Sequence, residues 1–101
     1  MLRDLQFLDF EWDAGNWPKC AKHGLSREDI EAVFGATPFV IPARTVTPEL
    51  RYAAIGRTPT GNYAFIVFTL RMTAAGTLIR PISARYMHAK EVQHHESTKG
   101  A

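Results

Sequence analysis

Residues that could carry out chemistry are concentrated in one stretch near the end of the 101-residue chain, Leu78–Glu91. This stretch begins as an apolar run and ends in a charged segment that holds Arg85, His88 and Glu91. Guanidinium groups stabilise developing phosphate charge, while histidine and glutamate can transfer protons. No other part of the sequence mixes core-forming and reactive residues so densely.

A wider set of residues has the types needed to cleave RNA by attack of a 2′-hydroxyl group. Such cleavage needs a base near the hydroxyl, cations around the phosphorane and an acid for the leaving 5′-oxygen, but no metal ion or cofactor. The candidates are His23, Arg51, Arg71, Arg80, Arg85, Tyr86, His88 and Glu91. Residue types alone do not show that these side chains converge, so an ordinary charged strand–helix junction stays open as the alternative.

Other kinds of site have weaker support. Gly56 and Gly61 flank a turn and follow no strand-to-helix junction, so the chain has no glycine-rich phosphate loop. Cys20 and His23 are spaced like metal ligands, but no second pair stands at zinc-site spacing. Because Cys20 is the only cysteine, it cannot form an internal disulfide, which agrees with a reducing compartment.

The formal net charge of +2 hides an asymmetry between the two parts of the chain. Residues 1–31 hold seven acidic and four basic residues, whereas residues 36–90 hold seven basic residues and one acidic residue. Six of those seven basic residues are arginines, which suit bidentate phosphate contacts. The functional interpretation is one basic surface that binds a polyanion, with contributions from Arg51, Arg71, Arg80 and Arg85. The alternative is that the arginines only solvate the open face of a sheet.

Length and composition indicate one globular domain in a cytoplasmic protein. A chain of 101 residues with 46% hydrophobic and 22% charged residues has room for a single core. The apolar run 63–68 is too short to span a bilayer, and the acidic N-terminus is unlike a signal peptide. We expect a domain over residues 1–96 and a flexible tail over residues 97–101.

The first half of the chain predicts a short strand and two helices. Apolar residues within 5–10 favour a strand, and Trp17–His23 favours a short helix that ends at Gly24. Ser26 is followed three residues later by Asp29, which predicts a capped helix from Ser26 to Phe34.

The second half predicts an antiparallel meander followed by a helix. The expected strands are 39–41, 50–55, 63–70 and 78–85, with a loop over 43–49. Residues 63–70 are apolar at both parities, so this strand should be central, and Pro81 should mark an edge or a bulge. Residues 87–96 should form a helix with few apolar side chains. The predicted fold class is α+β, with two N-terminal helices packed on an antiparallel sheet of three to five strands and a C-terminal helix.

Four stretches resemble the BrnT family of toxins from type II toxin–antitoxin systems. They are FEWD at Phe10–Asp13, KHGLSREDIEAVF at Lys22–Phe34, RYAAIGRTPTGNYAFIVFTLR at Arg51–Arg71 and IRPISARYMHAKE at Ile79–Glu91. They follow the family's order and cover most of residues 10–96. The resemblance implies a RelE-like fold and a metal-independent endoribonuclease that cleaves RNA and inhibits translation.

The family's motifs fall on specific residues of this sequence. Its lysine-histidine-glycine motif falls on Lys22–Gly24, and its arginines at the two ends of the meander fall on Arg51 and Arg71. Its serine-alanine-arginine signature falls on Ser83–Arg85 and its helix glutamate on Glu91. The family often has a tyrosine late in the last helix, in the region where this sequence has His95, so we expect a different packing of that helix.

The resemblance and the residue types together suggest roles for these side chains. The predicted catalytic residues are His23, Arg51, Arg71, Arg85 and Glu91, and the predicted substrate-binding residues are Lys22, Arg80, Tyr86 and His88. We expect Arg85 to stabilise the scissile phosphate, with Arg51 or Arg71 assisting. His23 and Glu91 are the candidates for proton transfer, with His88 as a further candidate.

The resemblance also implies the partners. A BrnA-type antitoxin, a DNA-binding ribbon-helix-helix protein, would neutralise the chain, and RNA would be its substrate. DNA would be contacted only through the antitoxin, and no membrane would be involved. A homodimer and a hetero-tetramer both stay open, as does the alternative of a non-catalytic module that binds RNA or only its antitoxin.

Overall fold

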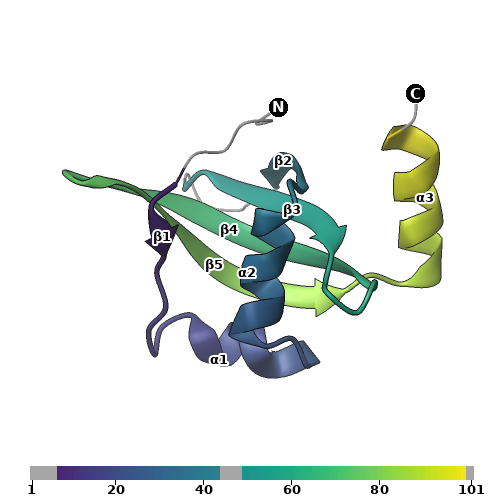
Figure 1. The fold of residues 1–101 in the computed structure, drawn as a ribbon, viewed down its shortest axis with the longest axis horizontal. Coiled ribbons are helices and arrows are strands. Elements are labelled where there is room, and N and C mark those ends of the chain that lie inside the picture. The colour runs from purple at the N-terminus through teal and green to yellow at the C-terminus, as the bar shows by residue number, and fades with distance from the viewer. Residues whose placement is uncertain (1–6, 44–48, 100–101) are drawn as a thin grey trace.

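The computed structural model describes residues 7–43 and 49–99, which form one twisted sheet with helices on one side and at one end (Figure 1). The elements in chain order are β1 (Asp9–Phe10), α1 (Trp17–Cys20), the 3-10 helix η1 (Ala21–His23), α2 (Arg27–Gly35), β2 (Phe39–Ala43), β3 (Arg51–Arg57), β4 (Tyr63–Thr73), β5 (Gly76–Tyr86) and α3 (Ala89–Lys99). The strand order is β1-β5-β4-β3-β2. The predicted α+β class is therefore confirmed.

One part of the predicted fold class is wrong, because the sheet is mixed and not purely antiparallel. β1 runs parallel to β5 and places Asp9 beside Leu78 and Phe10 beside Ile79. A two-residue strand carries no signal for its direction, which is decided by the chain path that leads into α1. Phe7 and Leu8 of the predicted first strand are described and do not belong to a strand, whereas its residues 5 and 6 and most of the predicted loop lie outside the described residues.

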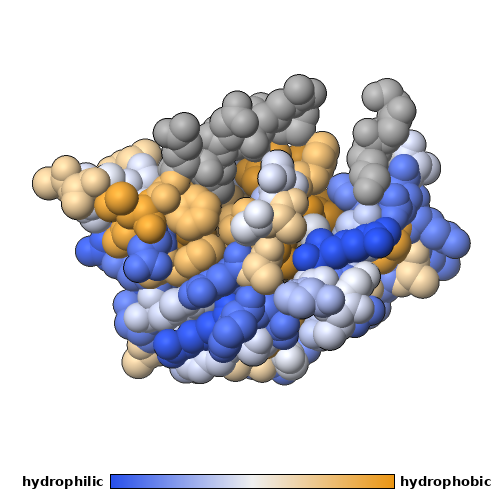
Figure 2. Space-filling model, in the orientation of Figure 1, coloured by the Kyte–Doolittle hydropathy of each residue, from blue (hydrophilic) through white to orange (hydrophobic). Residues whose placement is uncertain are grey.

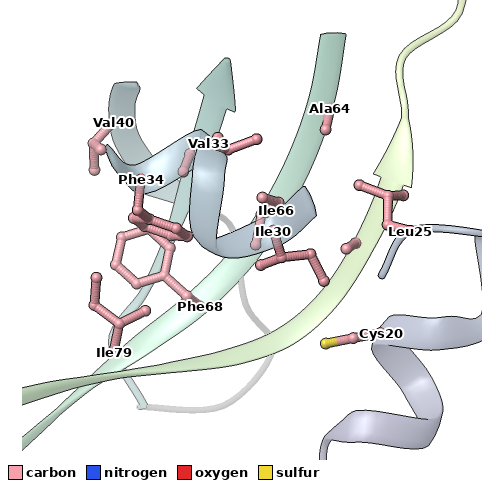
Figure 3. Close-up of a cluster of buried hydrophobic side chains, with 12 residues drawn as sticks. Cys20, Leu25, Ile30, Val33, Phe34, Val40, Ala64, Ile66, Phe68 and Ile79 are labelled. Atoms are coloured by element: carbon pink, nitrogen blue, oxygen red, sulfur yellow. The ribbon is translucent and has the colours of Figure 1, made fainter. Parts of the chain in front are cut away.

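The core lies between α2 and β4. β4 is the middle strand of the sheet, as its two-sided apolarity predicts. Ile30, Val33 and Phe34 of α2 pack over Ile66 and Phe68 of β4, with the rings of Phe34 and Phe68 5.0 Å apart (Figure 3). The capping box of Ser26 and Asp29 is present, so the start of α2 is set locally. Figure 2 shows that the exposed surface over α1 and α2 is mostly hydrophilic, while apolar residues gather towards β1.

Two predicted irregularities are present. A register shift interrupts the β4–β5 ladder where Val67 lies opposite Ser83 and Phe68 lies opposite Pro81, so one extra residue of β5 forms a bulge beside the proline. Gly24 has φ +91° and ends η1, as the sequence predicts.

The C-terminal helix is anchored by His95, the residue at which the sequence led us to expect a different packing of this helix. His95 is only 7% exposed, and its ring contacts Phe39 at 5.5 Å and Tyr63 at 5.3 Å, both edge to face. α3 continues to Lys99, so part of the expected tail is helical. No helix within the described residues is long and apolar enough to cross a membrane.

Asn16 fastens the segment between β1 and α1 to the edge of the sheet. Its side-chain amide is buried and donates to the carbonyl oxygens of Glu11 and Pro81, both at 2.8 Å. Its side-chain oxygen accepts from the backbone N–H of Asp13, also at 2.8 Å. The carbonyl of Pro81, on the edge of β5 beyond the end of β1, is thereby satisfied by a residue far away in the sequence.

Replacing Asn16 should therefore destabilise the fold. In Asn16→Ala the carbonyl groups lose their donor and the N–H of Asp13 loses its acceptor in a buried place, so the free energy of unfolding should fall by about 1–3 kcal/mol. Urea unfolding followed by circular dichroism measures it, with the exposed Gln93→Ala as control. An unchanged urea midpoint in Asn16→Ala would show that this contact contributes nothing.

Candidate active site

The face of the sheet opposite the core carries the arginines that were expected to form one basic surface. Arg85 lies opposite Phe65, and Arg80 lies opposite Thr69, in the β4–β5 ladder. Cross-strand partners point to one face and successive residues alternate. Both arginines are therefore on the face opposite the buried Ile66.

Arg71 and Arg51 point to this same face. Arg71 follows Thr69 by two positions, and Arg51 precedes Tyr52, whose ring packs towards the core at 5.7 Å from that of Phe68. The four arginines do not form one cluster. The β4 residues opposite Arg80 and Arg85 are four positions apart, which is about 13 Å along the strand. α1 and α2 lie on the other side of the sheet (Figure 1).

The most complete constellation lies where β5 ends and α3 begins. The guanidinium of Arg85 donates to both carboxylate oxygens of Glu91, at 2.7 and 2.8 Å, and lies 4.8 Å from the ring centre of Phe65. The backbone N–H of His88 donates to the same carboxylate at 2.9 Å. Glu91 is the third residue of α3, the position from which a glutamate reaches back to the residue before the helix. Helix capping thus positions Glu91, and Glu91 positions Arg85.

This contact sets the charge states of both side chains. The bidentate bond to Arg85, followed by the bond from His88, lowers the pKa of Glu91 to about 2, while the bond to Glu91 raises the pKa of Arg85. A carboxylate with so low a pKa accepts protons poorly at neutral pH. The geometry therefore favours an orienting contact between Glu91 and Arg85. Arg85 uses three N–H groups in its bonds to Glu91 and Tyr86, so two of its five donors remain.

A second constellation joins the acidic N-terminal segment to β4 and β5. Arg80 donates to Glu11 at 3.0 Å and to Asp13 at 2.9 and 3.1 Å, and Arg71 donates to Glu11 at 3.2 Å. The bonds from Arg80 lower the pKa of Asp13, and the bonds from Asp13 and Glu11 raise the pKa of Arg80. These contacts fasten β1 to the sheet edge.

The arginine face is thus far less basic than the sequence suggests. Arg51, the remaining member, lies 3.8 Å from the carboxylate of Glu49, and its buried Nε atom has no hydrogen-bond partner among the described residues. Each of the four predicted arginines therefore has a carboxylate beside it. The charge asymmetry along the chain was the available signal for these pairs, but both interpretations drawn from it, a ligand-binding surface and a solvated sheet face, left ion pairing out.

The structure separates the other predicted site residues. Lys22 and His23 are exposed on η1, which packs against β5 from the helical side, and no hydrogen bond or ion pair within the described chain joins them to Arg85. Tyr86 lies opposite Ala64 and packs partly on the core side. Of the predicted set, Arg85, Glu91 and His88 come together, and Arg71 and Arg80 come together elsewhere.

Metal binding has no support from the described part of the chain. Its His, Cys, Asp and Glu side chains form no group of three or more that could hold an ion. Cys20 is fully buried, and this burial raises the pKa of its thiol to about 11. The weak Cys20–His23 signal is therefore explained by packing of Cys20 in the core.

The coupling between Arg85 and Glu91 predicts a measurable titration. The Glu91 carboxylate should titrate near pH 2, and in Arg85→Ala its pKa should rise towards the ordinary 4.5. Because the folded-state pKa is depressed, the stabilisation is fully present above pH 4.5 and is lost as pH falls towards 2. Carboxyl-carbon NMR against pH measures both proteins. An unchanged Glu91 pKa in folded Arg85→Ala would contradict the pairing.

Comparison with known families agrees with the geometry. The chain matches the family model described as the ribonuclease toxin BrnT of type II toxin–antitoxin systems over residues 12–91. The match covers Arg71, Arg80 and the Arg85–Glu91 pair, begins one residue after Glu11 and ends at Glu91. No curated protein matches the chain. Since the family model spans well over half of the sequence, the chain belongs to the BrnT family of ribonuclease toxins from type II toxin–antitoxin systems.

Proposed function

We propose that this chain is an endoribonuclease that cleaves RNA without a metal ion and so inhibits translation. The 2′-oxygen attacks the neighbouring phosphorus, the 5′-oxygen leaves, and a 2′,3′-cyclic phosphate remains. Arg85 stabilises the charge of the phosphorane with the donors that Glu91 leaves open. Arg51 or Arg71 assists at the backbone of the bound RNA.

The observation that carries this proposal is the rigid placement of Arg85. Its guanidinium is held by two bonds to Glu91 and by the ring of Phe65, at the end of a strand on the open side of the sheet. A charge-stabilising donor is most effective when its orientation is fixed before the reaction. The exposed His88 stands beside this pair and is our first candidate for proton transfer, ahead of Glu91 and the more distant His23.

The remaining features follow from membership in the family. We propose a RelE-like arrangement of the sheet and helices, and a BrnA-type antitoxin of the ribbon-helix-helix class as the neutralising partner. The toxin would reach DNA only through this partner. Residues 1–96 would act as one domain, in a homodimer or a hetero-tetramer with the antitoxin, in the cytoplasm.

Removing Arg85 should abolish most of the activity without unfolding the protein. Arg85→Ala should reduce RNA cleavage by about a hundredfold or more, since losing one preorganised donor typically has this effect. Arg85→Lys retains the charge but loses the bidentate bond to Glu91, so it should rescue little. Cleavage of a fluorescent RNA, measured on the same samples as thermal unfolding, separates activity from folding.

The control for this experiment is Lys19→Ala, which removes an exposed positive charge from α1 and should cleave RNA at the wild-type rate. Full activity in folded Arg85→Ala would exclude Arg85 from the phosphate site and leave Arg71 as the next candidate. If the wild-type protein binds its antitoxin but cuts no RNA, the non-catalytic alternative holds.

The antitoxin should cover the same region. An apolar groove of about 470 Å³ lies beside Glu91, lined by residues that include Phe39, Phe65 and Met87. An amphipathic antitoxin segment could fill it and place carboxylates near Arg85. Hydrogen exchange with the antitoxin present should therefore show protection over residues 80–91, and an unrelated ribbon-helix-helix protein should give none. Protection confined to residues 1–20 would exclude this docking site.

A further inference from the structure

A second pocket lies at the other side of α3, between this helix and the turn that joins β3 to β4. It has a volume of about 510 Å³, and its polar lining includes Arg57, Asn62, Tyr63, Tyr86 and Glu96. Neither the residue patterns nor the family match assigns a role to Arg57 or Asn62. Met87 lines both this pocket and the apolar groove beside Glu91, so the pocket adjoins the proposed phosphate site.

The side chains at one end of the pocket are held in place by mutual contacts. The hydroxyl of Tyr63 donates to Glu96 at 2.9 Å, and Arg57 donates to the same carboxylate oxygen at 3.3 Å. The guanidinium of Arg57 also stacks on the Tyr63 ring, 4.8 Å from its centre, although 60% of its side chain remains exposed. The positive charge of Arg57 is therefore balanced by Glu96, and the pocket is close to neutral.

This lining suits a flat, neutral group with hydrogen-bonding edges better than it suits a bare anion. Asn62 is exposed, and its only side-chain hydrogen bond within the described residues is one donation to Thr60 at 3.3 Å, so its carbonyl oxygen and one N–H can pair with a base edge. Tyr86 and the stacked Arg57 offer planar surfaces, on which unpaired RNA bases stack.

We propose that this pocket binds the base of the nucleotide next to the cleaved phosphate, with Asn62 contacting the base edge and Arg57 stacking on it. The inference rests on the proposed ribonuclease function, which supplies the RNA. It makes the pocket a determinant of which RNA positions are cut. Binding of a partner protein's side chain is the competing use of the same pocket.

The test uses the full chain and probes that cannot be cleaved. The four nucleoside 5′-monophosphates, and inorganic phosphate separately, are titrated while backbone amide signals are followed by NMR. At least one nucleotide should shift the signals of Gly61, Asn62 and Met87, and phosphate alone should not. Asn62→Ala and Arg57→Ala should each weaken this binding about tenfold, as expected for losing a base contact. Lys19→Ala should bind like the wild type.

Three results would overturn the proposal. One is the absence of nucleotide-induced shifts at this pocket. If only the antitoxin causes shifts there, the pocket binds a protein partner instead. The second is an equal response to phosphate alone, and the third is wild-type affinity in folded Asn62→Ala. Because mononucleotides contain no internucleotide bond, nucleotide binding is measured whether or not the protein cleaves RNA. Cleavage without nucleotide binding here would refute the pocket and leave the proposed function intact.

Discussion

Burial of β4 on the core side is the constraint on which the rest of the molecule depends. Ile66 and Phe68 are fully buried beneath α2, and β4 forms backbone ladders with both β3 and β5. Once this face is covered, alternation places every second residue of β3 and β4 on the opposite face, and the extra residue of β5 beside Pro81 brings Arg80 and Arg85 to that same face. The positions of Arg51, Arg71, Arg80 and Arg85 on one side of the sheet follow from that packing and need no interaction among the arginines themselves.

Ion pairing then determines what this arginine face can do. Four arginines on one face would attract any polyanion, but carboxylates from the segment after β1, from the residues just before β3 and from α3 lie beside them. The bridges from Arg80 act structurally, since they fasten an edge strand of only two residues. The bridge from Arg85 differs, because its partner is itself fixed by the start of a helix and leaves part of the guanidinium open. On such a face, the position of each arginine matters more for ligand binding than the total positive charge does.

α3 has an unusual importance for so polar a helix. It is held by the buried ring of His95, by the bonds of Glu96 to Tyr63 and Arg57, and by the Arg85–Glu91 pair at its start. One pocket lies on each side of it, one mostly apolar and one mostly polar. A partner that moved α3 would therefore alter Arg85 and both pockets together, so the proposed antitoxin binding and the proposed cleavage would depend on the same helix.

The sequence by itself determined the local features. The capping box at Ser26, the end of η1 at Gly24, the central position of β4 and the bulge beside Pro81 all depend on residues within a few positions of one another, where helix caps, turns and periodicity act. The family could also be inferred from contiguous motifs. Only the tertiary structure decided the direction of β1, the hydrogen bonds of the Asn16 side chain and which carboxylate lies beside each arginine. Arg80 and Glu11 are far apart in the chain, and their contact depends on the register of β1 on β5. The same long-range packing put His23 on the helical side and Arg85 on the open side, which no spacing in the sequence could reveal.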